Sequence, residues 1–81
     1  MTVEIHYCHG TYIYIDDELI EDAYGTRVIG ENKIRVFVYK GHIDITAEEM
    51  TIVFDEKPGM KSGKVTISIN DVLPFSRYKT P

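Results

Sequence analysis

The stretch KIRVFVYKGHIDIT, residues 33–46, decides the fold because its side chains alternate between two kinds. Successive side chains of a β-strand point to opposite faces, so the alternation separates an aliphatic face from a mixed one. A turn at Lys40-Gly41 sets Val38 opposite Ile43 and aligns the aliphatic residues of two antiparallel strands. The other face then carries aromatic and polar side chains: Arg35, Phe37, Tyr39, His42 and Asp44.

A second hairpin follows in MTIVFDEKPGMKSGKVTISI, residues 50–69. The dipeptides Pro58-Gly59 and Ser62-Gly63 are strong turn signals, so they predict a long connection between two strands. Placing Phe54 opposite Val65 brings the apolar residues of both strands onto one face.

The N-terminal stretch VEIHYCHGTYIYI, residues 3–15, predicts another hairpin with a two-residue turn at His9-Gly10. Tyr7 then lies opposite Tyr12, and the hairpin has two different faces. One face carries Val3, Ile5, Tyr7, Tyr12 and Tyr14, and the other carries Glu4, His6, Cys8, Thr11, Ile13 and Ile15.

A fourth hairpin turns at Glu31-Asn32, with Ile29 opposite Ile34. Hairpins in sequence order predict an all-β fold, mainly an antiparallel meander of about six or seven strands. Such a meander must close or stack to bury one face, so we expect a small barrel or a two-layer sandwich. Residues 1–70 form a single small β domain in this interpretation, and residues 71–81 form an extended C-terminal tail.

One short helix is expected near residues 17–24. Asp16 or Asp17 can cap its N-terminus, and Gly25 can end it. Its apolar residues would fall on one side: Leu19, Ile20, Ala23 and Tyr24.

Composition narrows the range of functions. The chain has 81 residues and a net charge of −4, which argues against the basic stripe that nucleic-acid binding normally requires. The single cysteine, Cys8, rules out an intramolecular disulfide and fits a reducing compartment. The sequence contains no apolar run of membrane-spanning length and no signal-peptide pattern, so we expect a cytoplasmic protein.

A metal site is one alternative function, because two histidines and the cysteine lie close together in HYCH. His6 and Cys8 are two positions apart on a strand and would share a face, with His9 in the turn beside them. Zinc prefers such ligands but usually takes four, and the paired Cys-x-x-Cys and His-x-x-x-His patterns are missing. We therefore expect no cofactor and keep zinc as the alternative.

A single-stranded nucleic-acid site is a second alternative. Tyr7, Tyr12 and Tyr14 would share one face of the first hairpin, and aromatic side chains on a sheet can stack on bases. The acidic segment that follows the hairpin, residues 16–22, argues against the positive groove that this mechanism also needs.

Protein binding is the function that the sequence favours. No nucleophile motif or phosphate-binding loop occurs, so we expect no enzymatic activity. The mixed face of the central hairpin combines residue types that are enriched at interfaces, although it could instead pack against a second sheet. We expect a small module that binds another protein and also itself, as a homo-oligomer, and a short motif-free acidic domain is typical of accessory proteins of viruses or mobile elements.

Overall fold

The computed structural model describes residues 1–56, 63–72 and 76–79, with side chains for residues 1–54 and 63–70. All regular elements in these ranges are β-strands, as the alternating sequence predicts. They are β1 (Thr2–Tyr7), β2 (Thr11–Ile15), β3 (Glu18–Leu19), β4 (Ala23–Gly30), β5 (Lys33–Val38), β6 (Gly41–Glu56), β7 (Gly63–Val72) and β8 (Ser76–Lys79).

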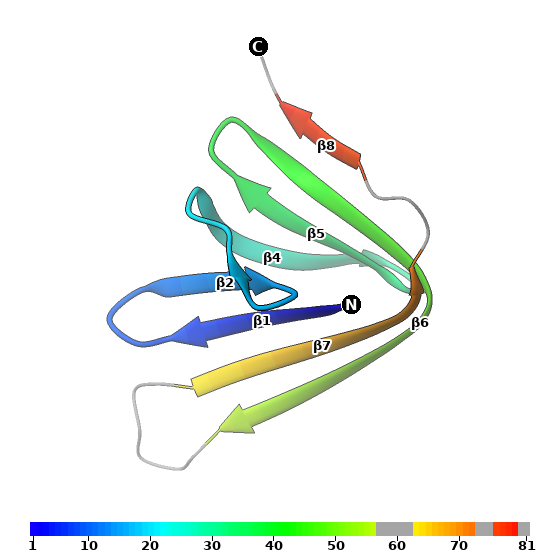
Figure 1. Cartoon of the computed structure of the whole chain (residues 1–81), viewed down its shortest axis with the longest axis horizontal. Helices are drawn as coiled ribbons and strands as arrows, with labels where there is room; N and C mark the ends of the chain where they lie inside the picture. The colour runs from blue at the N-terminus through cyan, green and yellow to red at the C-terminus, as the bar shows by residue number, and fades with distance from the viewer. Residues whose placement is uncertain (57–62, 73–75, 80–81) are drawn as a thin grey trace.

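The strands form one antiparallel sheet that curls into a half-barrel (Figure 1). The path through the sheet is β3-β2-β1-β7-β6-β5-β4, and β8 pairs with β6. The long strand β6 joins the two parts of the sheet, because residues 41–46 pair with β5 and residues 47–56 pair with β7. Figure 1 shows β6 bending sharply between these two parts, so the sheet folds back over its own inner face.

The core is the inner face of this half-barrel. Among the described residues it contains no buried polar or charged side chain. Its buried residues come from β1, β2, β5, β6 and β7: Val3, Ile5, Ile13, Ile15, Ile34, Val36, Val38, Ile43, Ile45, Ala47, Ile67 and Ile69. Burial of these side chains, roughly 1.5–3 kcal/mol for each Ile or Val, is the main force that holds the two parts of the sheet together.

The bend in β6 coincides with a change in the alternation of its side chains. Ala47 continues the buried odd-numbered positions, whereas Met50 begins a series of even-numbered positions that face the inner side. The two residues in the middle of the bend, Glu48 and Glu49, are both exposed. Where β6 leaves β5, the side chains that face the core therefore change from odd-numbered to even-numbered positions.

The pairing of β6 with β7 confirms the register predicted for this hairpin, with Phe54 opposite Val65. The separation of faces in the β5–β6 hairpin is confirmed as well, since its aliphatic face is buried. The predicted register of this hairpin is wrong by two positions. Val38 lies opposite Gly41 rather than Ile43, and Ile43 lies opposite Val36. A shift of two positions leaves every side chain on its expected face.

The predicted register of the first hairpin is wrong by one position. The connection has three residues, 8–10, so Tyr7 lies opposite Thr11 and His6 lies opposite Tyr12. His9 takes the positive φ of 53° that closes this longer loop. A one-residue shift exchanges the faces of one strand, and it places Ile13 and Ile15 in the core with Val3 and Ile5.

The helix predicted near residues 17–24 is wrong. Asp16 and Asp17 have φ values of 49° and 64°, the conformation of a two-residue type I′ turn that connects β2 to β3. Aspartate tolerates this conformation, and a helix of eight residues gains too few hydrogen bonds to offset its nucleation. The backbone N–H of Thr2 donates to the Asp16 carboxylate at 3.0 Å and fixes the turn against β1.

The ends of the sheet also differ from the prediction. β1 lies inside the sheet, between β2 and β7. β7 continues to Val72, and residues 76–79 of the predicted tail form β8 beside β6. In the hairpin of β4 and β5, Val28 rather than Ile29 lies opposite Ile34, because a bulge interrupts β4.

Candidate binding surface

The mixed side chains of the β5–β6 hairpin lie on the outer face of the half-barrel. We call this set, Arg35, Phe37, Tyr39, His42 and Asp44, the aromatic-polar face. The opposite side of the hairpin forms the core, so the aromatic-polar face is not the side on which the sheet packs against itself. Tyr39, in the turn of the hairpin, is 69% exposed.

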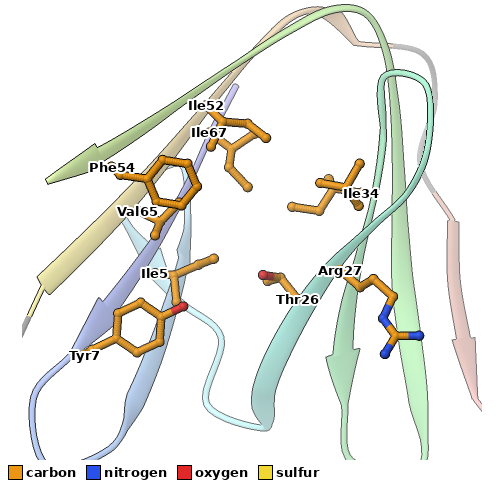
Figure 2. Close-up of a pocket in the computed structure, with 10 residues that line it drawn as sticks. Ile5, Tyr7, Thr26, Arg27, Ile34, Ile52, Phe54, Val65 and Ile67 are labelled. Atoms are coloured by element: carbon orange, nitrogen blue, oxygen red, sulfur yellow. The ribbon is translucent and has the colours of Figure 1, made fainter. Parts of the chain in front are cut away.

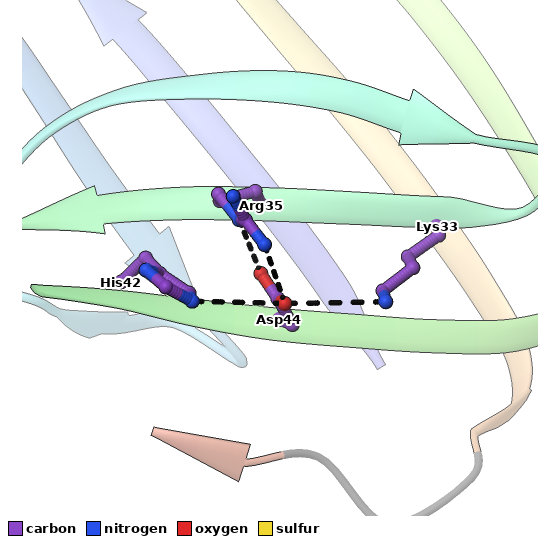
Figure 3. A network of polar contacts seen from close by, with 4 residues as sticks. All are labelled: Lys33, Arg35, His42 and Asp44. Carbon is purple, nitrogen blue, oxygen red and sulfur yellow. Dashed lines mark hydrogen bonds and ion pairs between the residues drawn. The ribbon is translucent and has the colours of Figure 1, made fainter. Parts of the chain in front are cut away.

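An ion cluster centred on Asp44 organises the polar part of this face (Figure 3). The Arg35 side chain donates two hydrogen bonds to the Asp44 carboxylate, from Nε at 2.7 Å and from Nη2 at 3.0 Å. His42 Nε2 lies 3.8 Å and Lys33 Nζ 4.0 Å from Asp44 Oδ2. The register makes this contact possible, because Arg35 and Asp44 lie directly opposite each other.

The surroundings of Asp44 hold its pKa below the ordinary value. The hydrogen bonds from Arg35 are the main cause, and the charges of Arg35, His42 and Lys33 act in the same direction. Partial burial opposes them, since the Asp44 side chain is only 12% exposed. Two parallel hydrogen bonds from one guanidinium form a bidentate pair, which adds geometric specificity to the charge interaction.

A residue of a neighbouring strand lies beside the aromatic-polar face and extends its aromatic surface. Tyr24 of β4 stacks on Phe37, with ring centroids 6.1 Å apart and an interplanar angle of 29°. Tyr24 is 65% exposed, and Lys40 Nζ lies 5.4 Å from the centre of the Tyr39 ring. Sequence reasoning missed Tyr24 because it assigned this residue to a helix. It missed Lys33 because the predicted register, which is shifted by two positions, placed Arg35 diagonal to Asp44 and Lys33 farther away.

The outer side of β4 and β5 is rich in positive charge although the whole chain is acidic. Arg27 lies directly opposite Arg35, so both side chains are on the outer face. Lys33, whose Nζ lies 4.0 Å from Asp44, and Lys40, which lies over the Tyr39 ring, add two further cationic side chains. A partner surface with acidic groups would therefore be electrostatically complementary to this region.

The three tyrosines of the nucleic-acid hypothesis do not share a face. Tyr7 follows Ile5 on the inner side and lines an apolar groove, whereas Tyr12 and Tyr14 lie on the outer side with His6. The His6 and Tyr14 rings are 4.8 Å apart, so Tyr14 packs against a neighbouring side chain. The structure thus offers no stacking platform made of all three rings.

The residues of the metal hypothesis are also separated. His6 is on the outer face of β1, with Nε2 3.9 Å from Glu4 Oε1, whereas Cys8 and His9 lie in the exposed loop. Across the described residues, no group of three or more His, Cys, Asp or Glu side chains is arranged to hold a metal ion.

An apolar groove that sequence reasoning missed opens on the inner side of the half-barrel (Figure 2). Its volume is about 180 Å³, and it lies between β4 and the part of the sheet formed by β1, β7 and the end of β6. Several of its lining side chains remain accessible: Tyr7 (42% exposed), Val28 (50%), Ile52 (38%) and Phe54 (65%). The even-numbered apolar residues after Glu49 are the sequence signal for this surface.

Comparison with known proteins adds no relative. No family model matches the sequence, and no curated protein or solved structure matches it significantly. Within the described residues, no helix has the length and apolar character needed to cross a bilayer. Function is therefore inferred from the residues and the geometry described above.

Proposed function

We propose that this protein is a small non-enzymatic module that binds another protein through its aromatic-polar face. The observation that carries the proposal is the exposure of Tyr24, which stacks on Phe37, and of Tyr39 in the hairpin turn, on the face that also holds the ion cluster of Asp44. Tyrosine and arginine are the residues that most often dominate interface energetics. Here they lie on a sheet whose core is on the other side, so a partner can contact them without disturbing the fold.

The chemistry of the face indicates what kind of partner it fits. Accessible rings provide apolar contact area, and the surrounding cations favour a partner surface that combines apolar and acidic groups. The ion cluster contributes orientation more than affinity, because its members already satisfy one another. We therefore expect most of the binding energy to come from Tyr24 and Tyr39.

Site-specific photocrosslinking tests the proposal directly. A benzophenone amino acid placed at Tyr39, in cells that naturally produce the protein, should attach to one specific partner. The same amino acid at Tyr12, which is 46% exposed on the outer side of β2, is the matched control and should not attach to that partner.

The purified partner then allows a quantitative test by isothermal titration calorimetry. The double variant Tyr24→Ala/Tyr39→Ala should bind at least tenfold more weakly, since truncation of two central aromatic residues typically costs more than about 1.4 kcal/mol. Tyr12→Ala should leave the Kd within about twofold. Unchanged affinity in the double variant, or an equal loss with Tyr12→Ala, would contradict the proposal.

A further inference from the structure

The inner groove is bordered by two strand edges that no other strand covers in the described part of the structure. β4 ends the path of the sheet, so only one of its edges is paired. Residues 48–56 of β6 pair with β7 on one side, while β5 ends its pairing with β6 at Thr46. The two edges diverge from the turn between β4 and β5, where Asn32 Nδ2 donates to the Glu48 carbonyl at 2.8 Å.

Apolar side chains follow both edges into the groove. Val28 of β4 lines the groove. Ile52 and Phe54 of β6 line the same space (Figure 2). Exposed strand edges beside exposed apolar side chains are features that soluble proteins normally cover or block. We call this combination of the groove with its two edges the mouth of the half-barrel.

The chain exposes more surface than a compact domain of its length. The accessible surface is 5657 Å², whereas a compact monomer of 9.3 kDa exposes about 5,000 Å². The radius of gyration is 12.7 Å, compared with about 11.7 Å for a compact domain of this length. The chain is therefore less compact than a closed domain of its length.

We propose that a second copy of this chain closes the mouth, with β4 of each copy lying along residues 48–54 of β6 in the other. The edges are complementary in charge, because β4 carries Arg27 and this part of β6 begins with Glu48 and Glu49. One two-fold axis would form both contacts at once, and a single chain supplies both halves of the interface. The proposal is independent of the aromatic-polar face, which remains on the outer side of each copy.

Analytical ultracentrifugation of the purified protein from 1 to 100 μM tests this inference. Measurements at about 0.15 M salt limit the repulsion between two chains of net charge −4. We expect a reversible dimer of twice 9.3 kDa. Val28→Glu and Phe54→Glu should each raise its dissociation constant at least tenfold, because each places a carboxylate in the apolar mouth.

Val53→Glu is the matched control, since Val53 is 54% exposed on the outer side of the same strand. This variant should dimerise within about twofold of the wild type, as should Tyr24→Ala/Tyr39→Ala. A wild-type monomer at 100 μM would overturn the inference and leave the mouth to a different occupant. A dimer that Val28→Glu and Phe54→Glu leave intact, or that Val53→Glu weakens equally, would overturn it as well.

Hydrogen exchange of the wild type keeps the inference testable if the variants do not fold. Backbone amides in β4 and in residues 48–54 should exchange more slowly at 100 μM than at 1 μM. Amides of β1, which is paired on both sides, provide the internal control and should not change. Equal exchange in β4 at both concentrations would contradict closure of the mouth by a second copy.

Discussion

The open half-barrel predicts that two apolar side chains on the same inner face differ strongly in their effect on stability. Ile34 is fully buried, whereas Phe54 is 65% exposed at the mouth. Truncation of Ile34 to alanine should cost about 3 kcal/mol, because it removes a fully buried side chain and leaves a cavity. About 70 Å² of Phe54 is covered, which at about 25 cal/mol per Å² corresponds to no more than ~1.7 kcal/mol. Alanine retains part of that contact, so Phe54→Ala should cost about 1 kcal/mol.

Thermal unfolding by circular dichroism at 1 μM, where association is weakest, measures this difference. For a domain of this size, 1 kcal/mol lowers the Tm by roughly 4–8 °C. Ile34→Ala should therefore lower the Tm by about 12–24 °C, and Phe54→Ala by about 4–8 °C. Val53→Ala, on the outer side, should change the Tm by no more than about 4 °C. Equal losses for Ile34→Ala and Phe54→Ala would refute the open mouth, because they would show that the isolated chain already buries Phe54.

Three smaller predictions concern the polar contacts and turns. Asp44→Asn should lower the free energy of unfolding by about 1.5 kcal/mol at neutral pH. Arg35 lowers the pKa of Asp44 in the folded protein, so this stabilisation is present above about pH 4 and is lost as the pH falls through the lowered pKa. The urea midpoints of variant and wild type should therefore converge in acid. Asn32 has a φ of 53°, and its side chain donates a hydrogen bond to the Glu48 carbonyl. In thermal unfolding, Asn32→Ala should lose about 2 kcal/mol of stability and Asn32→Gly only about half of that, because glycine adopts this φ without strain. Equal losses of stability would exclude backbone strain at this position. Lys40 has a φ of 55°, and Lys40→Gly should stabilise the protein by up to ~1 kcal/mol in urea unfolding, while a loss of stability would contradict this reason.

The parts of the fold that the sequence could predict are those that depend on alternation alone. The aliphatic face of the β5–β6 hairpin is buried because five of its inward positions are Ile or Val, and this holds whichever turn connects the strands. The register of β6 with β7 was predicted because only one alignment brings Phe54 and Val65 together with all their apolar neighbours. Local burial patterns were therefore sufficient for the antiparallel architecture and for the members of the aromatic-polar face.

The errors arise where turn geometry decides the structure. His9, Asp16 and Asp17 all adopt positive φ without being glycine, so the usual glycine signal placed the first turn wrongly and missed the second. The error at His9 shifted β1 by one position and brought three tyrosines onto one predicted face. The acidic run that begins at Asp16 resembles the start of a helix, but its first two residues form a tight turn.

The pairing of β1 with β7 was missed for a different reason. Val3 and Ile67 are 64 positions apart in the sequence, and neither strand carries a signal that identifies its partner. The bend of β6 was within reach of sequence reasoning, because the inward series ending at Ala47 and the one beginning at Met50 are out of phase. The four residues AEEM therefore mark the position where one strand leaves one part of the sheet and enters the other.

The change of phase in β6 has consequences for both proposed surfaces. It turns residues 48–56 away from β5, so in the described part of the chain no strand pairs with the edges of β4 and β6 around the mouth. It also separates the inner apolar surface from the outer face on which Tyr24 and Tyr39 lie. A dimer formed through the mouth would consequently carry two aromatic-polar faces, one on each copy. Two linked faces bind a partner with repeated sites far more tightly than one does, because the second contact forms at high effective concentration. Self-association through one surface would thus strengthen partner binding through the other without any contact between the two sites.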